Sequence, residues 1–175
     1  MRHSIFFALA AACSLIGLAE TRAADDDQQK AIVALQKLGG KVELESKKAV
    51  NSAHLSDTKV KDEDLKTLKA FGTLHKLYLQ NTGITDTGLE SLKDLTDLQS
   101  LSLNKTKVTD AGLDSLKGMS KLKVLSLSNT KVTDKGLDSL KELTNLQTLH
   151  LKGTKVTDAG VKDLKKALPK LEIDR

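Results

Sequence analysis

The stretch from Leu98 to Lys121 reads LQSLSLNKTKVTDAGLDSLKGMSK and is one of four copies of a single 24-residue phrase. Leu74, Leu98, Leu122 and Leu146 each begin a copy with the pattern L-x-x-L-x-L-x-x-T-x-V/I-T-D-x-G-L/V-x-x-L. A fixed period of this size indicates a stack of similar structural units, because each unit must complete its core against a neighbour. The phrase therefore predicts the architecture of most of the chain.

Each copy changes its hydrophobic period half-way along. In the second copy Leu101 and Leu103 alternate with Ser102, which predicts a short strand with the leucines inside and the serine outside. The second half has apolar residues at spacings of three and five, which predicts a short helix packed through one stripe. These residues are Val108, Leu113, Leu116 and Met119.

A Thr-Asp-x-Gly tetrad at the start of each predicted helix supplies the N-terminal signals. In the second copy we expect Thr109 to cap the first free amides and Asp110 to meet the positive end of the helix dipole. Gly112 follows in a place where glycine lowers helix stability, so adjacent units are expected to approach too closely there for a side chain. The other tetrads begin at Thr85, Thr133 and Thr157.

A second column of threonines follows each predicted strand. We expect these side chains to point inward and to bond to backbone groups, because the amides and carbonyls of a buried bend need partners. A catalytic role is disfavoured, since five copies of one nucleophile would serve no purpose. The predicted structural ladder consists of Thr58, Thr82, Thr106, Thr130 and Thr154.

The period extends towards the N-terminus and divides the chain into three parts. Residues 1–23 form a predicted signal peptide, and residues 24–49 form a predicted cap of one amphipathic helix and one short strand. Residues 50–175 form about five repeats and a terminal strand. A stack of repeats needs a terminal unit with a polar outer face, and the cap has the right place and pattern for that unit.

The predicted signal peptide has a short positive region and an apolar run from Ile5 to Ala19. That run is too short for a membrane span. Cleavage is predicted after Ala23 or, alternatively, after Ala19, and Cys13 leaves open a bacterial lipoprotein. We expect an exported protein, periplasmic or secreted, with no transmembrane span in the mature chain.

Composition disfavours several classes of function. The chain has 28 basic and 23 acidic residues, a net charge of +5 and 2% aromatic residues, whereas proteins that bind nucleic acids usually add aromatic platforms or a known motif. His75 is expected to neighbour His54. His150 lies four repeats from His54, about 19 Å away by strand spacing, which is too far for the two histidines to bind one metal ion. No phosphate loop, metal cluster or nucleophile–base pair is evident. We expect no nucleic-acid binding, no catalysis, no cofactor and no metal.

The phrase T-K-V-T-D-x-G-L after L-x-x-L-x-L resembles the ribonuclease-inhibitor-like leucine-rich repeats, and within them the T-D-x-G-L subclass of F-box proteins and exported bacterial proteins. Residues 31–42, A-I-V-A-L-Q-K-L-G-G-K-V, resemble the cap of the bacterial group. The resemblance covers about residues 25–175 and implies a curved α/β leucine-rich repeat solenoid with short parallel strands on the concave side and helices on the convex side. It also implies protein binding, while the missing F-box and the threonines in place of cysteine argue against ubiquitin ligation.

The polar positions around each strand predict a concave face that binds another protein. Tyr78 is the only aromatic residue among them, and interfaces concentrate their binding energy in Tyr, Trp and Arg. The alternative is that Tyr78 is an ordinary surface residue. The candidate partner-binding residues are His54, Lys76, Tyr78, Gln80, Ser102, Asn104, Ser126 and His150.

Lysines form two further columns. The helical lysines have an acidic residue three positions earlier in three copies, which predicts a solvated convex face with stabilising charge pairs. The lysines after the strands have fewer acidic neighbours, so the alternative function is an envelope-associated structural or glycan-binding component that contacts an anionic polymer. The lysines after the strands are Lys59, Lys107, Lys131 and Lys155.

Overall fold

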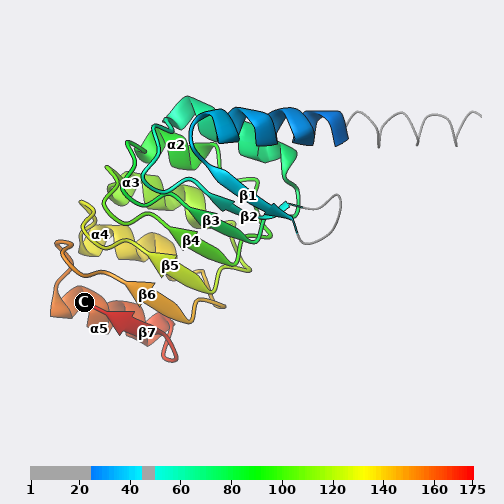
Figure 1. Cartoon of the computed structure of the whole chain (residues 1–175). Helices are drawn as coiled ribbons and strands as arrows, with labels where there is room; N and C mark the ends of the chain where they lie inside the picture. Colours follow the sequence, from blue (N-terminus) through cyan, green and yellow to red (C-terminus); the bar gives the residue numbers. More distant parts are fainter. Residues whose placement is uncertain (1–24, 45–49) are drawn as a thin grey trace, which may run out of the picture.

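The computed structural model describes residues 25–44 and 50–175 (Figure 1). The predicted signal peptide, its cleavage points and Cys13 lie outside the described residues. Seven strands form one sheet in the order β1-β2-β3-β4-β5-β6-β7. The strands line one side of the stack and the short helices line the other. This arrangement confirms the predicted α/β repeat solenoid.

The sheet repeats with the sequence. β1 pairs antiparallel with β2, and every later pair is parallel. Lys76 lies opposite Ser100, which lies opposite Val124, so each parallel pair between β3 and β6 keeps the offset of one repeat. The strands are β1 Lys41–Leu44, β2 Val50–His54, β3 Lys76–Tyr78, β4 Ser100–Ser102, β5 Val124–Ser126, β6 Thr148–His150 and β7 Glu172–Asp174.

In the central repeats the helical half is shorter than the apolar stripe predicts. In the third described repeat α3 makes one turn before the chain tightens into a 3-10 helix, so Val108 precedes the helix and Met119 follows it. Leu113 and Leu116 are three residues apart, a spacing that a 3-10 helix places on one side. The helices are residues 25–37, η1 Asp62–Ala70, α2 Asp86–Glu90, α3 Asp110–Leu113, η2 Asp114–Leu116, α4 Asp134–Leu137, η3 Asp138–Leu140 and α5 Asp158–Ala167.

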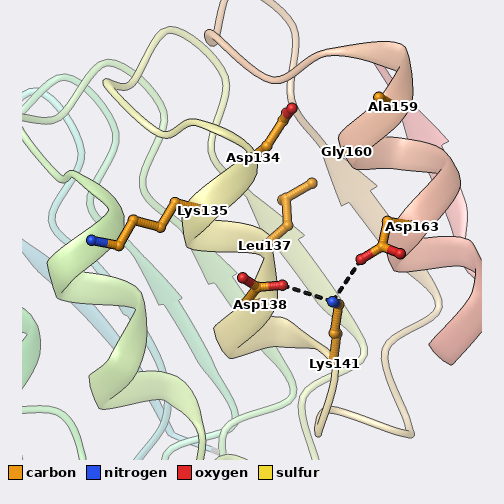
Figure 2. Close-up of a pocket in the computed structure, with 8 residues that line it drawn as sticks. All are labelled: Asp134, Lys135, Leu137, Asp138, Lys141, Ala159, Gly160 and Asp163. Atoms are coloured by element: carbon orange, nitrogen blue, oxygen red, sulfur yellow. Dashed lines mark hydrogen bonds and ion pairs between the residues drawn. The ribbon is translucent and has the colours of Figure 1, made fainter.

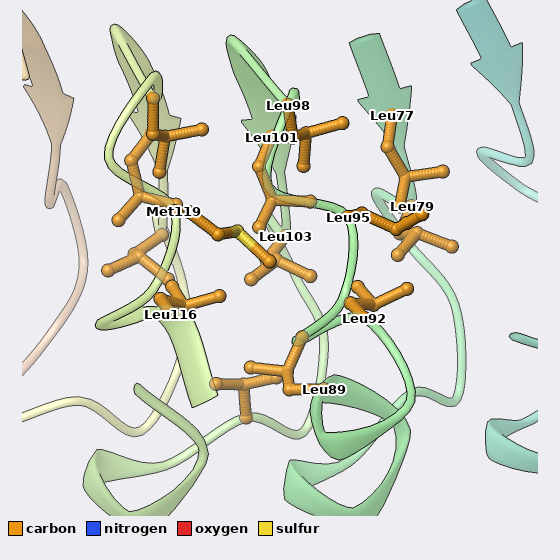
Figure 3. Packing of buried hydrophobic residues seen from close by; sticks show 14 of the residues in the cluster. Leu77, Leu79, Leu89, Leu92, Leu95, Leu98, Leu101, Leu103, Leu116 and Met119 are labelled. Carbon is orange, nitrogen blue, oxygen red and sulfur yellow. The ribbon is translucent and has the colours of Figure 1, made fainter. Parts of the chain in front are cut away.

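The core is one continuous cluster that neighbouring repeats share (Figure 3). Leu77 of β3 pairs in register with Leu101 of β4, and both side chains are fully buried. In the two repeats labelled in Figure 3, the strand leucines pack on the leucines of the helical segment behind them. Because each layer covers the next, a single repeat cannot bury its own apolar surface. One row of this core, with a residue from each of four repeats, is Phe71, Leu95, Met119 and Leu143.

A residue in the left-handed conformation follows β2, β3, β4, β5 and β6. In the first four of these turns φ lies between 54° and 59°, and in the fifth, at Gly153, it is 72°. Asparagine, aspartate and glycine tolerate this conformation better than other residues. Lys105 is therefore the least suited member of the column. The other members are Asp57, Asn81, Asn129 and Gly153.

The predicted threonine ladder hydrogen-bonds within each repeat. The Thr106 hydroxyl donates to the Leu103 carbonyl oxygen at 2.7 Å, and the corresponding threonines bond at 2.6–2.7 Å to the leucine three residues earlier. The Thr106 amide also approaches this carbonyl, but at 3.3 Å. Thr82, Thr106 and Thr130 are buried, so the hydroxyls satisfy carbonyl groups that water does not reach.

Replacing Thr106 by valine, which has nearly the same shape, is expected to lower the free energy of unfolding by about 1–3 kcal/mol, because a buried carbonyl loses its short hydrogen bond. Urea denaturation followed by circular dichroism measures the change. Thr144→Val is the control, since Thr144 is exposed. Equal stability of Thr106→Val and the wild type would contradict a structural role for the ladder.

Candidate functional site

An aromatic stack lies at the N-terminal end of the concave sheet. His54 of β2 is the cross-strand neighbour of Tyr78 on β3, and the two rings stack with centroids 4.6 Å apart and an interplanar angle of 22°. His54 Nε2 also lies 3.0 Å from Ser52 Oγ and 3.4 Å from Glu43 Oε1. These contacts fix the histidine ring, and the histidine in turn supports one face of the tyrosine.

The expected pairing of His75 with His54 is wrong. The parallel register places Tyr78 opposite His54, while His75 precedes β3 and its Nδ1 lies 3.1 Å from Asn51 Oδ1. His75 lies three residues before Tyr78, and successive residues of a strand point to opposite faces, so this error in register exchanges the two sides.

A hollow of about 470 Å³ opens beside the stack. Its polar side chains come from both sides of β2: Lys41 and Glu43 from β1, and Gln80 from the turn after β3. The structure thus brings together the predicted residues His54, Tyr78 and Gln80. Lys41 and Glu43 were missed because β1 is antiparallel and does not follow the repeat, although their alternation in K-V-E places both on one face of a strand.

The other predicted concave residues do not join this hollow. Ser102 lies opposite Tyr78 in the sheet, on the predicted outer face. It is only 8% exposed, so its expected accessibility to a partner is wrong. A serine beside a large ring on a concave surface has little area left to expose. Asn104 uses Oδ1 to accept a hydrogen bond from the Ser128 amide at 2.8 Å. Ser126 is half-buried on β5.

Two further candidates also lie outside the stack. Lys76 is exposed on β3 and does not line the hollow. His150 lies at the far end of the sheet, where its Nδ1 is 3.3 Å from Asp174 Oδ2 of β7. The eight candidates therefore do not form one cluster. The N-terminal hollow is the part of the concave face where large side chains of mixed charge converge.

An aspartate–threonine latch joins neighbouring repeats and was not anticipated from the sequence. Asp86 accepts two hydrogen bonds from Thr109 of the next repeat, from the amide at 2.8 Å and from the hydroxyl at 2.6 Å. Thr109 makes no capping hydrogen bond to its own helix, so the predicted cap is wrong there. The other latches are Asp62–Thr85, Asp110–Thr133 and Asp134–Thr157.

In the last latch, Asp134–Thr157, the surroundings of the aspartate lower its pKa. Hydrogen bonds from Thr157 lower the pKa of the Asp134 carboxyl, and the positive charge of Arg175 lowers it further. Arg175 itself pairs with the Asp158 carboxylate and donates a 2.8 Å hydrogen bond to the Val156 carbonyl. Asp158, which corresponds in the repeat to Asp134, is thus paired with an arginine, whereas Asp134 is bonded to a threonine.

A second hollow, of about 350 Å³, lies between α4 and α5 on the convex side (Figure 2). Lys141 bridges Asp138 and Asp163 there, with both N–O distances at 2.7 Å. Hydrogen bonds to Asp138 and then to Asp163 raise the pKa of Lys141 to about 12. The predicted pairs three residues apart are present at Asp138–Lys141 and Asp114–Lys117. Lys141 is therefore neutralised by carboxylates within this hollow.

Across residues 25–44 and 50–175, no group of three or more His, Cys, Asp and Glu side chains could hold a metal ion. No helix in these ranges has the length and apolar character that crossing a membrane requires.

Comparison with known proteins places the repeats in a recognised class. Leucine-rich repeat family profiles match residues 98–156 and residues 73–93. Together with the 24-residue register of the sheet, these matches define an α/β leucine-rich repeat solenoid. No curated protein matches the chain at a significant level.

Solved structures share this fold. An internalin (inlF) from Listeria monocytogenes superimposes with a TM-score of 0.61 and 27% identity, covering 71% of this chain and 34% of that one. A leucine-rich repeat protein of Leptospira interrogans gives 0.51 and 23%, covering 71% and 37%. The PEPR1-AtPEP1 crystal structure gives 0.51 and 21%, covering 76% and 19%. The chain thus spans about a third of the internalin or less than two fifths of the Leptospira protein.

Proposed function

We propose that this chain is a non-enzymatic protein-binding scaffold that acts outside the cytoplasm and holds its partner at the N-terminal end of the concave sheet. Protein binding is supported by the leucine-rich repeat matches. Action outside the cytoplasm is supported by the charge and apolar pattern of residues 1–23. The observation that carries the location of the site is the stack of His54 and Tyr78 beside the hollow.

The stack has the properties of an interface anchor. Tyr78 is half-buried, whereas Phe71, the other aromatic residue in the described chain, is fully buried. A ring that is already held by a neighbour loses little conformational freedom on binding, and aromatic residues often carry much of the binding energy of an interface.

Charges around the stack favour a polar rim. Glu43 and Lys41 present opposite charges on β1, and the Glu43 side chain is 68% exposed. Such groups orient a partner and exclude wrong ones more than they add affinity. We expect the partner to place an aromatic or aliphatic side chain on Tyr78 and polar groups towards Lys41 and Glu43.

Replacing Tyr78 by alanine is expected to weaken partner binding about tenfold or more, because the anchor loses its apolar area. Affinity capture from an envelope extract, compared between wild type and variant, identifies the partner, and calorimetric titration of the purified pair gives both dissociation constants. Tyr78→Phe retains the stacked ring and is expected to bind within about threefold of wild type.

Lys93→Ala is the matched control, because Lys93 is exposed on the convex side. Binding by Tyr78→Ala that equals binding by Lys93→Ala would place the interface elsewhere.

A further inference from the structure

One edge of the solenoid is strongly basic. It consists of the turns that follow β2 to β6, towards which the strand arrowheads point in Figure 1. Residues 56–61, 80–85, 104–109, 128–133 and 152–157 make up these turns and contain seven lysines but one acidic residue, Asp57. Asp57 accepts a hydrogen bond from Asn81 Nδ2 at 2.6 Å. The lysines that define this basic edge are Lys59, Lys61, Lys105, Lys107, Lys131, Lys152 and Lys155.

The lysines of the basic edge are exposed, and none of their amines forms an ion pair with a described residue. The aspartates that follow these lysines in the chain already have other partners. The oxygens of Asp62, Asp110 and Asp134 accept latch hydrogen bonds from threonines. Asp158 pairs with Arg175. On the helical side, by contrast, Lys69, Lys117 and Lys141 each pair with a carboxylate. The basic edge thus gathers seven exposed lysines whose amines form no ion pair with a described residue.

Three of these lysines stand in one row. The amides of Lys107, Lys131 and Lys155 donate to carbonyls of the preceding repeat at 2.9–3.1 Å. The row therefore advances one repeat at a time, by about 4.8 Å per step. Like charges in adjacent positions repel each other and destabilise a sheet or solenoid. Stability of the fold does not explain this row.

The backbone conformation of Lys105 is a second observation that points to a function for the basic edge. It has φ of +54° in a column whose other members are Asp, Asn, Asn and Gly. A lysine gains nothing from this conformation, and asparagine would adopt it with less strain. Backbone strain of this kind is often retained for a function, and here it adds a lysine two residues before Lys107.

We propose that the basic edge binds a linear anionic glycan, with the polymer lying along the solenoid so that carboxylates or sulfates of successive sugars meet lysines of successive repeats. The turns of the basic edge contain no aromatic residue, and single-stranded nucleic acids usually require aromatic platforms for their bases. Ser56 and Gln80 of the first two turns also line the hollow beside the His54–Tyr78 stack, but none of the seven lysines does. The proposal therefore rests on residues other than those that carry the proposed protein site.

The test compares two triple variants that remove the same charge. Lys107→Gln/Lys131→Gln/Lys155→Gln changes the row, and Lys93→Gln/Lys162→Gln/Lys165→Gln changes exposed lysines of the helical side. Titration with heparin and with polygalacturonate at about 150 mM salt keeps diffuse attraction screened. The row variant is expected to bind at least about tenfold more weakly than the wild type, and the helical variant within about threefold.

The probes separate the possible sources of charge. Binding of polygalacturonate assigns the site to carboxylates, and binding of heparin alone assigns it to sulfates. Monomeric galacturonate is expected not to bind, because one charge meets one lysine. Equal losses in the two triple variants, no binding of either polymer by the wild type, or equally tight binding of an oligo-thymidine would each overturn the proposal.

Lys105→Asn distinguishes lost binding from lost folding. It is expected to raise the melting temperature, because asparagine relieves the left-handed strain, and to weaken polymer binding about two- to threefold. A variant that is more stable and binds as tightly as the wild type would remove Lys105 from the site. A higher melting temperature together with weaker polymer binding would show that the lysine charge itself binds the polymer.

Discussion

Phe71→Ala is expected to lower the free energy of unfolding by about 3–5 kcal/mol. Phe71 directly follows η1 and is fully buried, and it begins the core row that continues through Leu95. Removing the ring deletes apolar area and leaves a cavity that the flanking strands cannot fill without losing register. Urea denaturation followed by circular dichroism gives the change in unfolding free energy.

The row also supplies the control. Its later members are Leu95, Met119 and Leu143, so the same place in the repeat accepts an aliphatic side chain. Phe71→Leu is expected to cost less than about 1.5 kcal/mol. Because neighbouring repeats share one core, both variants are expected to unfold in a single transition. A loss below about 1 kcal/mol for Phe71→Ala, or separate melting of the first repeat, would contradict a shared core.

Periodic features were predictable from the sequence because residues one repeat apart have the same surroundings. The leucines at Leu101 and Leu103 are buried as their alternation predicts, and the same offset of 24 residues placed His54 beside Tyr78 in the sheet. Lys41 and Glu43 escaped prediction because β1 pairs antiparallel with β2, which no repeat period can indicate.

The latch was missed for a different physical reason. Rules based on local sequence predict that an aspartate at the start of a helix interacts with the helix dipole. They predict that the preceding threonine caps the free amides of the first turn. In the structure Asp86 reaches Thr109, 23 residues later. Only the close stacking of adjacent coils makes this contact available, and stacking distance is not encoded in any single repeat.

The same stacking explains the glycine of each tetrad and leads to the second large effect. A Cβ atom on Gly136 would lie 2.5 Å from Asp110 Oδ1 and 3.2 Å from Asp110 Cα. The carboxylate cannot simply move, because it holds the amide and the hydroxyl of Thr133, both at 2.7 Å. The missing side chain of Gly136 thus leaves the space that Asp110 of the preceding repeat occupies.

Gly136→Ala is therefore expected to lower the free energy of unfolding by about 2–4 kcal/mol. Two hydrogen bonds contribute about 1 kcal/mol each and overpacking contributes about 1–3 kcal/mol, while the higher helix propensity of alanine offsets about 1 kcal/mol. Gly118→Ala is the matched control, since the nearest atom to its new Cβ, the Lys93 carbonyl oxygen, would be 4.0 Å away. Its stability is expected to stay within about 0.5 kcal/mol of wild type.

A double-mutant cycle with Asp110→Ala tests whether the latch is the cause. In the Asp110→Ala background the carboxylate is absent, so the further change Gly136→Ala is expected to cost less than about 1 kcal/mol. The methyl group of Leu113, 3.0 Å from the new Cβ, accounts for the cost that remains. If Gly136→Ala were equally destabilising with and without Asp110, the glycine would serve the backbone of its own helix, and the stacking of the coils would not depend on the latch.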